Sequence, residues 1–337
     1  MITQKEIAAR LAVSQTLVSR VLSGTAPAIG VAPATISRIR QAAARAGYRP
    51  NAAALSLRGG PSRTVGMVIR NFEDPFLGHV LGTLQELARE RGYALLLTGD
   101  GTGATRPDLA VLLQYRVDGL IIIGSDFVPV GLAAFLRQSV PVVMIGAGAP
   151  VKGVTRVAAD EAGGVRKLVH YLCTAGHRRI GLLGNRTHSN QRRKRWAEQE
   201  LRRKKLPFRP EWFVTPASDA AEAGYVGMRH LLALPPDRRP TAIIALEDVM
   251  AQTALRAVFE AGLQVPRDLS MVSIDDIPAA ARMIPALTTL RLPIREMAQA
   301  AFDLLLQPHP RSHRLLPPTL QTRESCGTIA AVREAEL

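Results

Sequence analysis

Three polar side chains of types that can read DNA bases lie close together near the N-terminus. Gln15, Thr16 and Arg20 span six residues, and helix residues four or five positions apart project to nearly the same side. Glutamine can pair with adenine and arginine with guanine in the major groove of DNA. The same pattern also suits the solvated face of a small helical domain. The spacing therefore favours base reading if these residues belong to a helix that DNA can reach.

Residues that would indicate catalysis do not occur in a recognised spacing. The segment GAGAPV (residues 146–151) lacks the third glycine of the dinucleotide-binding fingerprint. The sequence contains neither the Lys-Ser/Thr pair of a phosphate loop nor a Gly-x-Ser-x-Gly elbow. Two cysteines, Cys173 and Cys326, are too few for a zinc cage and suit reduced structural thiols. We therefore expect no enzyme, no cofactor and no metal site.

Local signals predict two short helices at the N-terminus, the second of which carries the three polar side chains. Thr3 and Glu6 have the spacing of a capping box, which starts a helix that ends near Leu11. Ser14 is the expected cap of the second helix, 15–22. The valines and leucines of that helix repeat at helical spacing, so they are expected to face inward and leave the polar side chains outside.

A third helix is expected from Pro33 to about Gly47, after a loop rich in glycine, alanine and proline at residues 23–32. The connection between the first two helices, Ala12-Val13, is short enough to hold them at a steep angle. This is the geometry of a helix-turn-helix, whose second helix enters the major groove.

The net charge of +15 is concentrated in two segments. Residues 1–65 contain nine Lys and Arg against one acidic residue, and residues 186–205 contain nine against two. A small cationic N-terminal segment favours a polyanion such as DNA, because each neutralised phosphate releases counterions.

From Thr64 onward, short apolar runs alternate with amphipathic stretches, which is typical of parallel sheets covered by helices on both faces. The candidate strands are 65–69, 94–98, 119–124, 140–145, 180–184, 242–246 and 271–274. The candidate helices are 76–91, 109–115, 161–175 and 249–261. About ten such units predict an α/β fold of two doubly wound lobes, with a ligand bound where the carboxyl ends of the strands converge.

The length of 337 residues predicts more than one domain. No apolar run has the length of a membrane span, and the charged N-terminus does not have the apolar stretch of a secretory signal. A cytoplasmic location is therefore expected.

With these elements placed, the sequence resembles the lactose-repressor (LacI/GalR) family over essentially its full length. The resemblance rests on VSQTLVSRVLSG (13–24), AGYRPNAAALSLRGG (46–60), DPFLGHVLGTLQELARERGYALLL, RVDGLIII, AGHRRIGLLG, SIDD, PALTTL and RESC, which occur in the order of that family. It implies an N-terminal three-helix helix-turn-helix domain (1–49), a hinge helix and linker (50–60) and a two-lobed effector-binding and dimerisation domain (61–337) that resembles periplasmic binding proteins.

The chain departs from the family pattern at several positions. The loop before the third helix is longer, and the cap of that helix is Ala32 instead of serine. Leu17 replaces a common threonine, which would remove a contact to a DNA phosphate. In the sensor domain, Glu247-Asp248 replaces an Asn-Asp pair and Gly146 replaces a frequent aspartate. We therefore expect an effector different from those of the best-known sugar repressors.

The resemblance assigns candidate DNA contacts to both N-terminal segments. In the family, a leucine at the position of Leu57 wedges between base pairs in the minor groove, although this alanine-rich stretch also suits a flexible linker. The candidate DNA-binding residues are Thr3, Ser14, Gln15, Thr16, Ser19, Arg20, Asn51, Ala54, Leu57 and Arg58.

It also assigns a candidate effector site. The candidate residues are Phe72, Phe76, Asp126, Arg192, Arg193, Glu247, Asp248 and Asp275. An aspartate at the position of Asp275 holds ligand hydroxyls or amines in the family, although an aspartate at a strand end is often only a helix cap. Arg192 or Arg193 corresponds to the ligand-binding arginine, in a register that QRRKRW leaves open by one residue, and a solvated basic face is the alternative. Ordinary core packing is the alternative for Phe72 and Phe76, and His177 is expected to be a structural turn residue.

These observations predict a transcriptional regulator, most simply a repressor, that binds pseudopalindromic operator DNA as a homodimer, because one recognition helix covers a half-site. The cationic stretch 186–205 suggests a polar effector that is a sugar or a sugar-derived acid. The alternatives are a solute-binding protein of the transport type, which would not need residues 1–60, and an α/β enzyme.

Overall fold

The computed structural model describes residues 2–23, 26–48, 61–69, 71–99, 108–124, 128–148, 150–307 and 313–329. Its contacts divide the chain into two compact units, Met1–Arg63 and Thr64–Leu337. None of the helices in these ranges is both long enough and apolar enough to cross a membrane.

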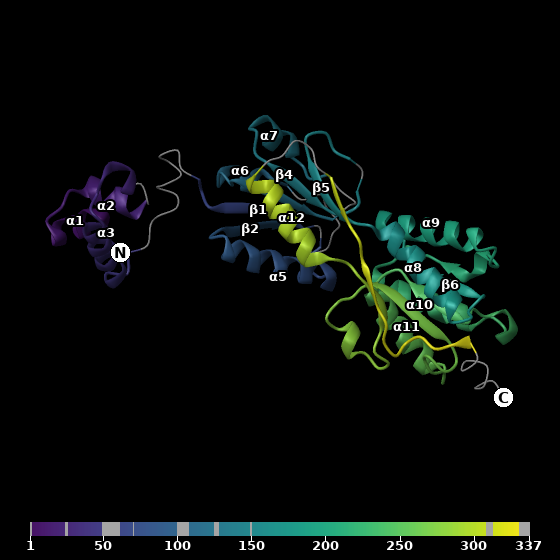
Figure 1. Cartoon of the computed structure of the whole chain (residues 1–337). Helices are drawn as coiled ribbons and strands as arrows, with labels where there is room; N and C mark the ends of the chain where they lie inside the picture. The colour runs from purple at the N-terminus through teal and green to yellow at the C-terminus, as the bar shows by residue number, and fades with distance from the viewer. Residues whose placement is uncertain are drawn as a thin grey trace. The chain divides into compact units, whose positions relative to one another are not determined.

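In its described residues, the smaller unit contains three α-helices around a small apolar core (Figure 1). The helices are α1 (Gln4–Leu11), α2 (Gln15–Leu22) and α3 (Pro33–Arg45), with a 3-10 turn at Pro27–Ile29. The predicted capping box is present between Thr3 and Glu6, and Ala12 ends α1 in the left-handed conformation at φ 53°. The turn into α2 is therefore tight, and the predicted helix-turn-helix order is confirmed.

The first lobe of the larger unit contains a six-stranded sheet in which every pair of neighbouring strands is parallel. Its strand order is β11-β5-β4-β3-β1-β2. The strands are β1 (Thr64–Ile69), β2 (Ala94–Gly99), β3 (Gly119–Ile123), β4 (Val142–Ile145), β5 (Thr155–Ala159) and β11 (Arg314–Leu316). The helices are α5 (Pro75–Glu90), α6 (Ala110–Gln114), α7 (Leu132–Arg137) and α12 (Ile294–Leu306).

The second lobe repeats this architecture, with the strand order β12-β10-β9-β8-β6-β7. The strands are β6 (Ile180–Leu183), β7 (Phe213–Val214), β8 (Ala242–Ala245), β9 (Ser270–Asp275), β10 (Thr288–Arg291) and β12 (Thr319–Gln321). The helices are α8 (Glu161–Thr174), α9 (His188–Arg203), α10 (Ala220–Leu232) and α11 (Asp248–Glu260), with 3-10 turns at Pro210–Trp212, Pro236–Arg238 and Ala280–Arg282. Only the β10–β12 pair of this sheet is antiparallel.

The chain passes between the two lobes three times in the described ranges. It leaves the first lobe after β5, returns after β10 into α12, which packs on α5 and on β3 to β5, and leaves again between β11 and β12 (Figure 1). One continuous core of buried apolar side chains extends through both lobes. The three crossings place the carboxyl ends of β1, β3, β4, β6, β8 and β9 around one space.

The predicted two-lobed α/β fold is confirmed, and all seven candidate strands are present with shifts of one or two residues at their ends. The sequence interpretation missed β5, β7, β10, β11 and β12. The last three lie at or near the sheet edges and contain only three or four residues each. Such short strands carry too few residues for a period-2 or continuous apolar pattern to be recognised.

Candidate functional site

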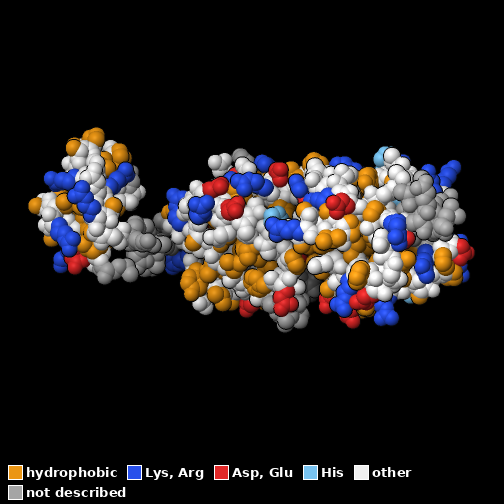
Figure 2. Space-filling view, turned by 90° about the horizontal axis from the view of Figure 1, so that it is seen from below, with side chains coloured by type: hydrophobic (Ala, Val, Ile, Leu, Met, Phe, Trp, Pro, Cys, Tyr) orange, Lys and Arg blue, Asp and Glu red, His pale blue; other side chains and the backbone are white. Residues whose placement is uncertain are grey.

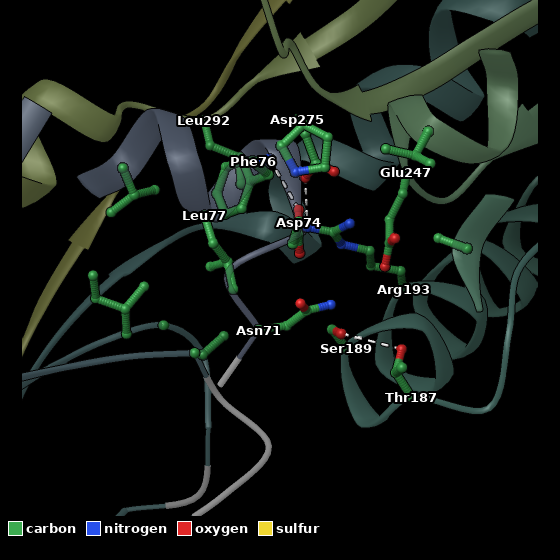
Figure 3. A pocket seen from close by; sticks show the side chains of 18 of the residues that line it. Asn71, Asp74, Phe76, Leu77, Thr187, Ser189, Arg193, Glu247, Asp275 and Leu292 are labelled. Atoms are coloured by element: carbon green, nitrogen blue, oxygen red, sulfur yellow. Dashed lines mark hydrogen bonds and ion pairs between the residues drawn. The ribbon is translucent and has the colours of Figure 1, made fainter. Parts of the chain in front are cut away.

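A cavity of about 610 Å³ lies between the two lobes, where the carboxyl ends of their strands meet. Its wall combines segments from both lobes: the β1–α5 connection, the ends of β3 and β4, the N-terminus of α8, the β6–α9 connection and the ends of β8 and β9. Figure 3 shows polar side chains from these segments facing one another across the space. This is the position expected for a ligand in doubly wound folds.

Arg193, from the first half of α9, is the centre of the polar wall. Its Nε donates to Glu161 Oε2 (2.6 Å), its Nη2 donates to Asp275 Oδ1 (3.1 Å), and its Nη1 donates to the carbonyl oxygen of Leu246 (2.6 Å). The side chains of Arg193, Glu161 and Asp275 are all buried. Burial alone would lower the pKa of Arg193, but the negative charges of Glu161, Asp275 and Glu247, together with the hydrogen bond to Glu161, outweigh burial and raise it. The guanidinium is therefore a permanent cation whose charge is already matched.

Asp275 ends β9 with an unusual backbone conformation. Its φ is 123° and that of Asp276 is 55°, in the left-handed region that favours glycine. Arg291 Nε and Arg323 Nη2 hold the carboxylate of Asp276 at 2.5 and 2.6 Å. Strained residues of this kind persist where the surrounding contacts fix them and are concentrated at ligand sites. The strain turns the Asp275 carboxyl group into the cavity wall, where burial raises its pKa well above the ordinary value.

Two further carboxyl groups approach from opposite lobes. Asp74 caps α5 by accepting from the backbone N–H of Phe76 (2.9 Å), and burial raises its pKa. Glu247, at the start of α11, accepts from Asn190 Nδ2 (2.9 Å). In Figure 3 the side chains of Asp74, Arg193 and Asp275 converge, and Glu247 lies on the side of the second lobe.

The charges on the described part of the wall are strongly unequal. Six carboxyl groups line the cavity, against one guanidinium group; the carboxyl groups belong to Glu73, Asp74, Glu161, Asp219, Glu247 and Asp275. The other polar contributors are amides and hydroxyls, from Asn71, Asn185, Thr187, Ser189 and Ser218. The wall as described therefore favours ligands that donate hydrogen bonds over ligands that bring negative charge.

Four of the eight candidate effector-binding residues line this cavity: Phe76, Arg193, Glu247 and Asp275. Of the two arginines at 192–193, Arg193 lines the cavity and Arg192 does not, and which of them contacts the effector stays a prediction. Phe72, which was expected to approach the ligand, is 44% exposed and does not line the cavity. Asp126 lies outside the described residues.

The placement of Asp248 in the cleft is also wrong. This side chain is fully buried beneath the wall, where its carboxylate accepts from Ser273 Oγ, from Thr289 Oγ1 (2.6 Å) and from the backbone N–H of Ile277 (2.8 Å). Burial raises its pKa to about 6. Asp248 therefore ties α11 to β9 and β10, one residue beyond the position that faces the ligand space.

Sequence reasoning missed several lining residues, above all Asp74, Glu161 and Thr187. Asp74 and Thr187 each follow a strand and cap the next helix, so the cap signal after a strand could have indicated their position at the carboxyl edge of a sheet. Glu161 is the first residue of α8, directly after the cap residue Asp160. No local signal pairs Glu161 with Arg193, which is 32 residues away.

The DNA-reading candidates on α2 have the exposure expected of them. Gln15, Thr16 and Arg20 are exposed and Ser19 is half-buried, whereas Val18 and Val21 are buried in the core of the unit. Figure 2 shows many Lys and Arg side chains and very few acidic ones on the visible face of the smaller unit, whereas both signs are interspersed over the larger unit.

Thr3 and Ser14 serve as helix caps. Thr3 Oγ1 accepts from the N–H of Glu6 (3.2 Å) and Ser14 Oγ accepts from the N–H of Leu17 (3.1 Å). Any contact of Thr3 or Ser14 with DNA would come from exposed backbone groups or from the hydrogen bonds that these hydroxyls can still form. The hinge candidates Asn51, Ala54, Leu57 and Arg58 lie outside the described residues.

The residue His177, predicted to be structural, is buried in the second lobe. Its Nδ1 and Nε2 lie 3.0 Å from Thr241 Oγ1 and from the carbonyl oxygen of Gly327. Both cysteines are free thiols with pKa values raised by burial. None of these side chains lines the cavity.

Comparisons with known proteins agree with this arrangement. Residues 169–326 match a family described as a periplasmic binding protein-like domain. The chain is 32% identical over 313 residues to the HTH-type transcriptional repressor PurR of Pectobacterium carotovorum subsp. carotovorum, covering 91% of this chain and 90% of that protein.

Solved structures of similar length include regulators in complex with ligands. The lac repressor dimer bound to operator and the anti-inducer ONPF superposes with a TM-score of 0.78 at 25% identity, over 97% of this chain and 99% of that one. The transcriptional regulator CelR in complex with cellobiose superposes with a TM-score of 0.67 at 25% identity, over 96% of this chain and 100% of that one. These relatives are regulators, which agrees with the expectation that the chain is not an enzyme.

Proposed function

The chain belongs to the LacI/GalR family of transcriptional regulators, and on this premise we propose that it represses transcription by binding operator DNA under the control of a small polar effector. The observation that carries the proposal is the presence of two parts on one chain. One is a helix-turn-helix with exposed Gln15, Thr16 and Arg20, and the other is a two-lobed unit with a charged cavity.

Helix α2 would read the operator in the major groove. Gln15 and Arg20 can form bidentate hydrogen bonds with adenine and guanine, and the basic residues around them would neutralise phosphates. One α2 helix covers a half-site, so two copies of the chain, related by a twofold axis, would bind a pseudopalindrome. The lac repressor in the similar structure is such a dimer on its operator.

The effector would act by changing how the two lobes approach each other. A ligand that contacts both lobes binds the closed arrangement more tightly than the open one. This difference in affinity shifts the equilibrium toward the closed arrangement. Asp74 comes from the first lobe, whereas Arg193, Glu247 and Asp275 come from the second, so a ligand among them contacts both. Lobe closure would in turn change the affinity for the operator, because effector binding and DNA binding on one chain are linked by a coupling free energy.

The chemistry of the cavity supports a hydroxylated effector and argues against the anionic one that the basic stretch 186–205 suggested. Of the nine cations in that stretch, only Arg193 lines the cavity, and its charge is matched by Glu161 and Asp275. A sugar acid would meet an excess of carboxylates in the described wall, whereas hydroxyl groups can donate to them. CelR binds cellobiose in its similar structure, and we propose a polyhydroxylated ligand here.

Selection of bound sequences from random DNA tests the DNA-binding part of the proposal. We expect a pseudopalindromic site that binds at least about a thousandfold more tightly than scrambled DNA at about 0.15 M salt. Failure to enrich any sequence, together with ligand binding by the same preparation, would instead support a solute-binding protein.

A screen tests the effector part. Thermal shift in the presence of sugars, sugar acids, phosphorylated sugars and nucleobases identifies ligands, and fluorescence anisotropy on the selected operator shows whether each one changes DNA affinity. A ligand that stabilises the protein but leaves operator affinity unchanged would contradict the control mechanism.

A further inference from the structure

The basic stretch 186–205 contains nine cationic side chains, of which only Arg193 lines the effector cavity. Three others, Arg186, Lys194 and Arg195, line a second cavity of about 350 Å³ in the second lobe. The wall of this α9 cavity is formed by one face of α9, by the residues that follow β6 and by the residue that follows β7. Besides the three cations, the wall includes Asn185, Gln191 and Glu198.

The positions of these residues in the second lobe explain why they meet. The four that belong to α9 occur at positions 191, 194, 195 and 198, a spacing that places them on one face of the helix. Asn185 and Arg186 follow β6, which pairs in parallel with β7. The α9 cavity therefore lies at the carboxyl edge of the sheet, where doubly wound folds bind ligands. Asn185 lines both this cavity and the effector cavity.

The charges on the wall of the α9 cavity favour an anion. Lys194 Nζ lies 3.4 Å from Glu198 Oε1, so this cation is paired within the wall. Arg195 Nε donates to a neutral acceptor, the carbonyl oxygen of Gln191 (3.3 Å). Among the residues that the structure describes, neither Arg186 nor Arg195 forms an ion pair with a carboxylate. Two guanidinium groups thus share one cavity, and their repulsion would be relieved by a bound anion.

Asn185 adds a buried hydrogen-bond donor to the same wall. The residue is only 4% exposed, and its Oδ1 accepts from the N–H and Oγ1 of Thr187 (3.1 and 2.8 Å) and from Nδ2 of Asn190 (2.6 Å). The backbone donor fixes the orientation of the amide, and Nδ2 of Asn185 has no acceptor within the described part of the chain. A ligand oxygen would supply the acceptor that this amide lacks.

The size of the α9 cavity favours a small ligand over an extended polyanion. Cations farther along α9 are engaged elsewhere: Arg203 pairs with Glu200 at 2.7 Å, and the Arg202 guanidinium lies 4.7 Å from the centre of the Phe208 ring. The positive charge therefore does not form one continuous stripe along the helix. A volume of about 350 Å³ is in the range of small-molecule sites.

We propose that the α9 cavity is a second ligand site, which binds a phosphorylated small molecule. A phosphate group suits this wall because it accepts from several donors at once, matches the fork of a guanidinium group and carries up to two negative charges. Arg186 and Arg195 would hold the phosphate, with Lys194 and Asn185 as further donors. The site differs from the effector cavity in residues and in charge, and its existence does not depend on the proposed function.

Calorimetric titration of the full-length protein tests the site with three matched pairs of compounds. They are glucose 6-phosphate with glucose, ribose 5-phosphate with ribose, and adenosine monophosphate with adenosine. In about 0.15 M chloride, we expect at least one phosphorylated compound to bind with a Kd of about 1 mM or tighter. It should bind at least about tenfold more tightly than its uncharged partner, because charge-assisted contacts to the phosphate are lost without it.

Four substitutions localise the binding. Arg186→Gln and Arg195→Gln should each weaken binding of that compound by about tenfold. Glu198→Gln should tighten it by about threefold, because it removes the one carboxylate of the described wall. A gain in affinity cannot result from misfolding. Arg202→Gln removes the same charge from an exposed position of α9 outside the wall, and it should change the affinity by less than about twofold.

Four outcomes would overturn the inference. The first is that no phosphorylated compound binds at about 10 mM. The second is binding that persists unchanged in both Arg186→Gln and Arg195→Gln, which would place the compound elsewhere. The third is an equal loss in Arg202→Gln, which would indicate only the general positive field of α9. The fourth is that random duplex DNA, but none of the small phosphates, binds more weakly to Arg195→Gln than to the parent protein. Operator selection is measured separately, so its failure would remove the proposed function and leave this site intact.

Discussion

Arg193 illustrates how a single buried side chain can link several segments of the fold. It contacts the start of α8, the carbonyl oxygen that follows β8 and the end of β9, so it joins three segments of the second lobe at the cavity wall. Buried ion pairs are costly to form, but removing one partner is more costly because the remaining charge stays buried and unmatched.

Replacing Arg193 with methionine should therefore destabilise the larger unit strongly. We expect a loss of about 3–5 kcal/mol in the free energy of unfolding, because Glu161 and Asp275 would remain buried without a cation. Urea unfolding measures this value. Arg195→Met, at an exposed position on the same helix, is the matched control and should change stability by less than about 0.5 kcal/mol. Similar losses in both variants would show that the ion pairs of Arg193 contribute nothing specific.

Asp248 offers a second test at the residue scale, through pH. Its pKa is about 6 in the folded protein, above the ordinary value of 3.8, chiefly because of burial. The folded state therefore binds this proton more tightly than the unfolded state, and the contribution of Asp248 to stability falls as the pH rises from 3.8 to about 6.

Asp248→Asn should remove that pH-dependent contribution. The variant should be less stable than the parent, because an amide cannot accept from all three donors, and its deficit should shrink as the pH rises through this range. Urea unfolding at several pH values measures the difference. The exposed substitution Asp237→Asn serves as the control, and a deficit in Asp248→Asn that grows with pH would contradict the assignment.

Helix α2 has one apolar face, which is buried, and one polar face, which is exposed. Ser14 caps its first turn, Val18 and Val21 enter the core, and Gln15 and Arg20 are exposed. Such a short helix is marginal by itself, so its stability depends on the cap and on packing against α1 and α3. The packing of α2 therefore fixes which of its faces is exposed, and Gln15 and Arg20 lie on that face.

Arg20→Ala should consequently affect recognition more than stability. We expect a loss of about 1–3 kcal/mol on the selected operator and a smaller difference between operator and scrambled DNA. Anisotropy titrations on both DNAs measure the two affinities. Arg40→Ala, an exposed change on α3, should leave the ratio of the two affinities unchanged. An equal loss on both DNAs in Arg20→Ala would identify Arg20 as a phosphate contact.

For the whole molecule, the most consequential feature is the division into Met1–Arg63 and Thr64–Leu337. Among the residues that the structure describes, the core of the smaller unit contains seven buried apolar side chains, whereas one continuous core extends through both lobes of the larger unit. A small domain such as Met1–Arg63 buries a smaller fraction of its surface on folding than a large domain does. Its free energy of unfolding is correspondingly lower.

Calorimetry should therefore resolve two unfolding transitions. Ile39→Ala, in the core of the smaller unit, should cost about 2–5 kcal/mol and lower only the first transition. Ile243→Ala, in the core of the larger unit, should lower only the second. A single transition that responds to both substitutions would mean that the two units unfold cooperatively.

The sequence alone was sufficient for the features that depend on neighbouring residues. The capping box at Thr3, the cap at Ser14 and the exposed face of α2 follow from spacings within one or two helical turns. The long buried strands follow from continuous apolar runs. These signals also supported the two-lobed fold, because alternating strands and helices have few alternative arrangements.

The tertiary structure alone decided which side chains share the cavity. One residue along a helix turns the side chain by about 100°, so only the packing of α9 and α11 could separate Arg193 from Arg192 and Glu247 from Asp248. Asp74, Glu161 and Asp275 meet across large sequence distances because three crossings bring the strand ends of two sheets together. Net charge along the sequence favoured an anionic ligand, but most of those cations lie outside the cavity, and electrostatic energy depends on distance in space.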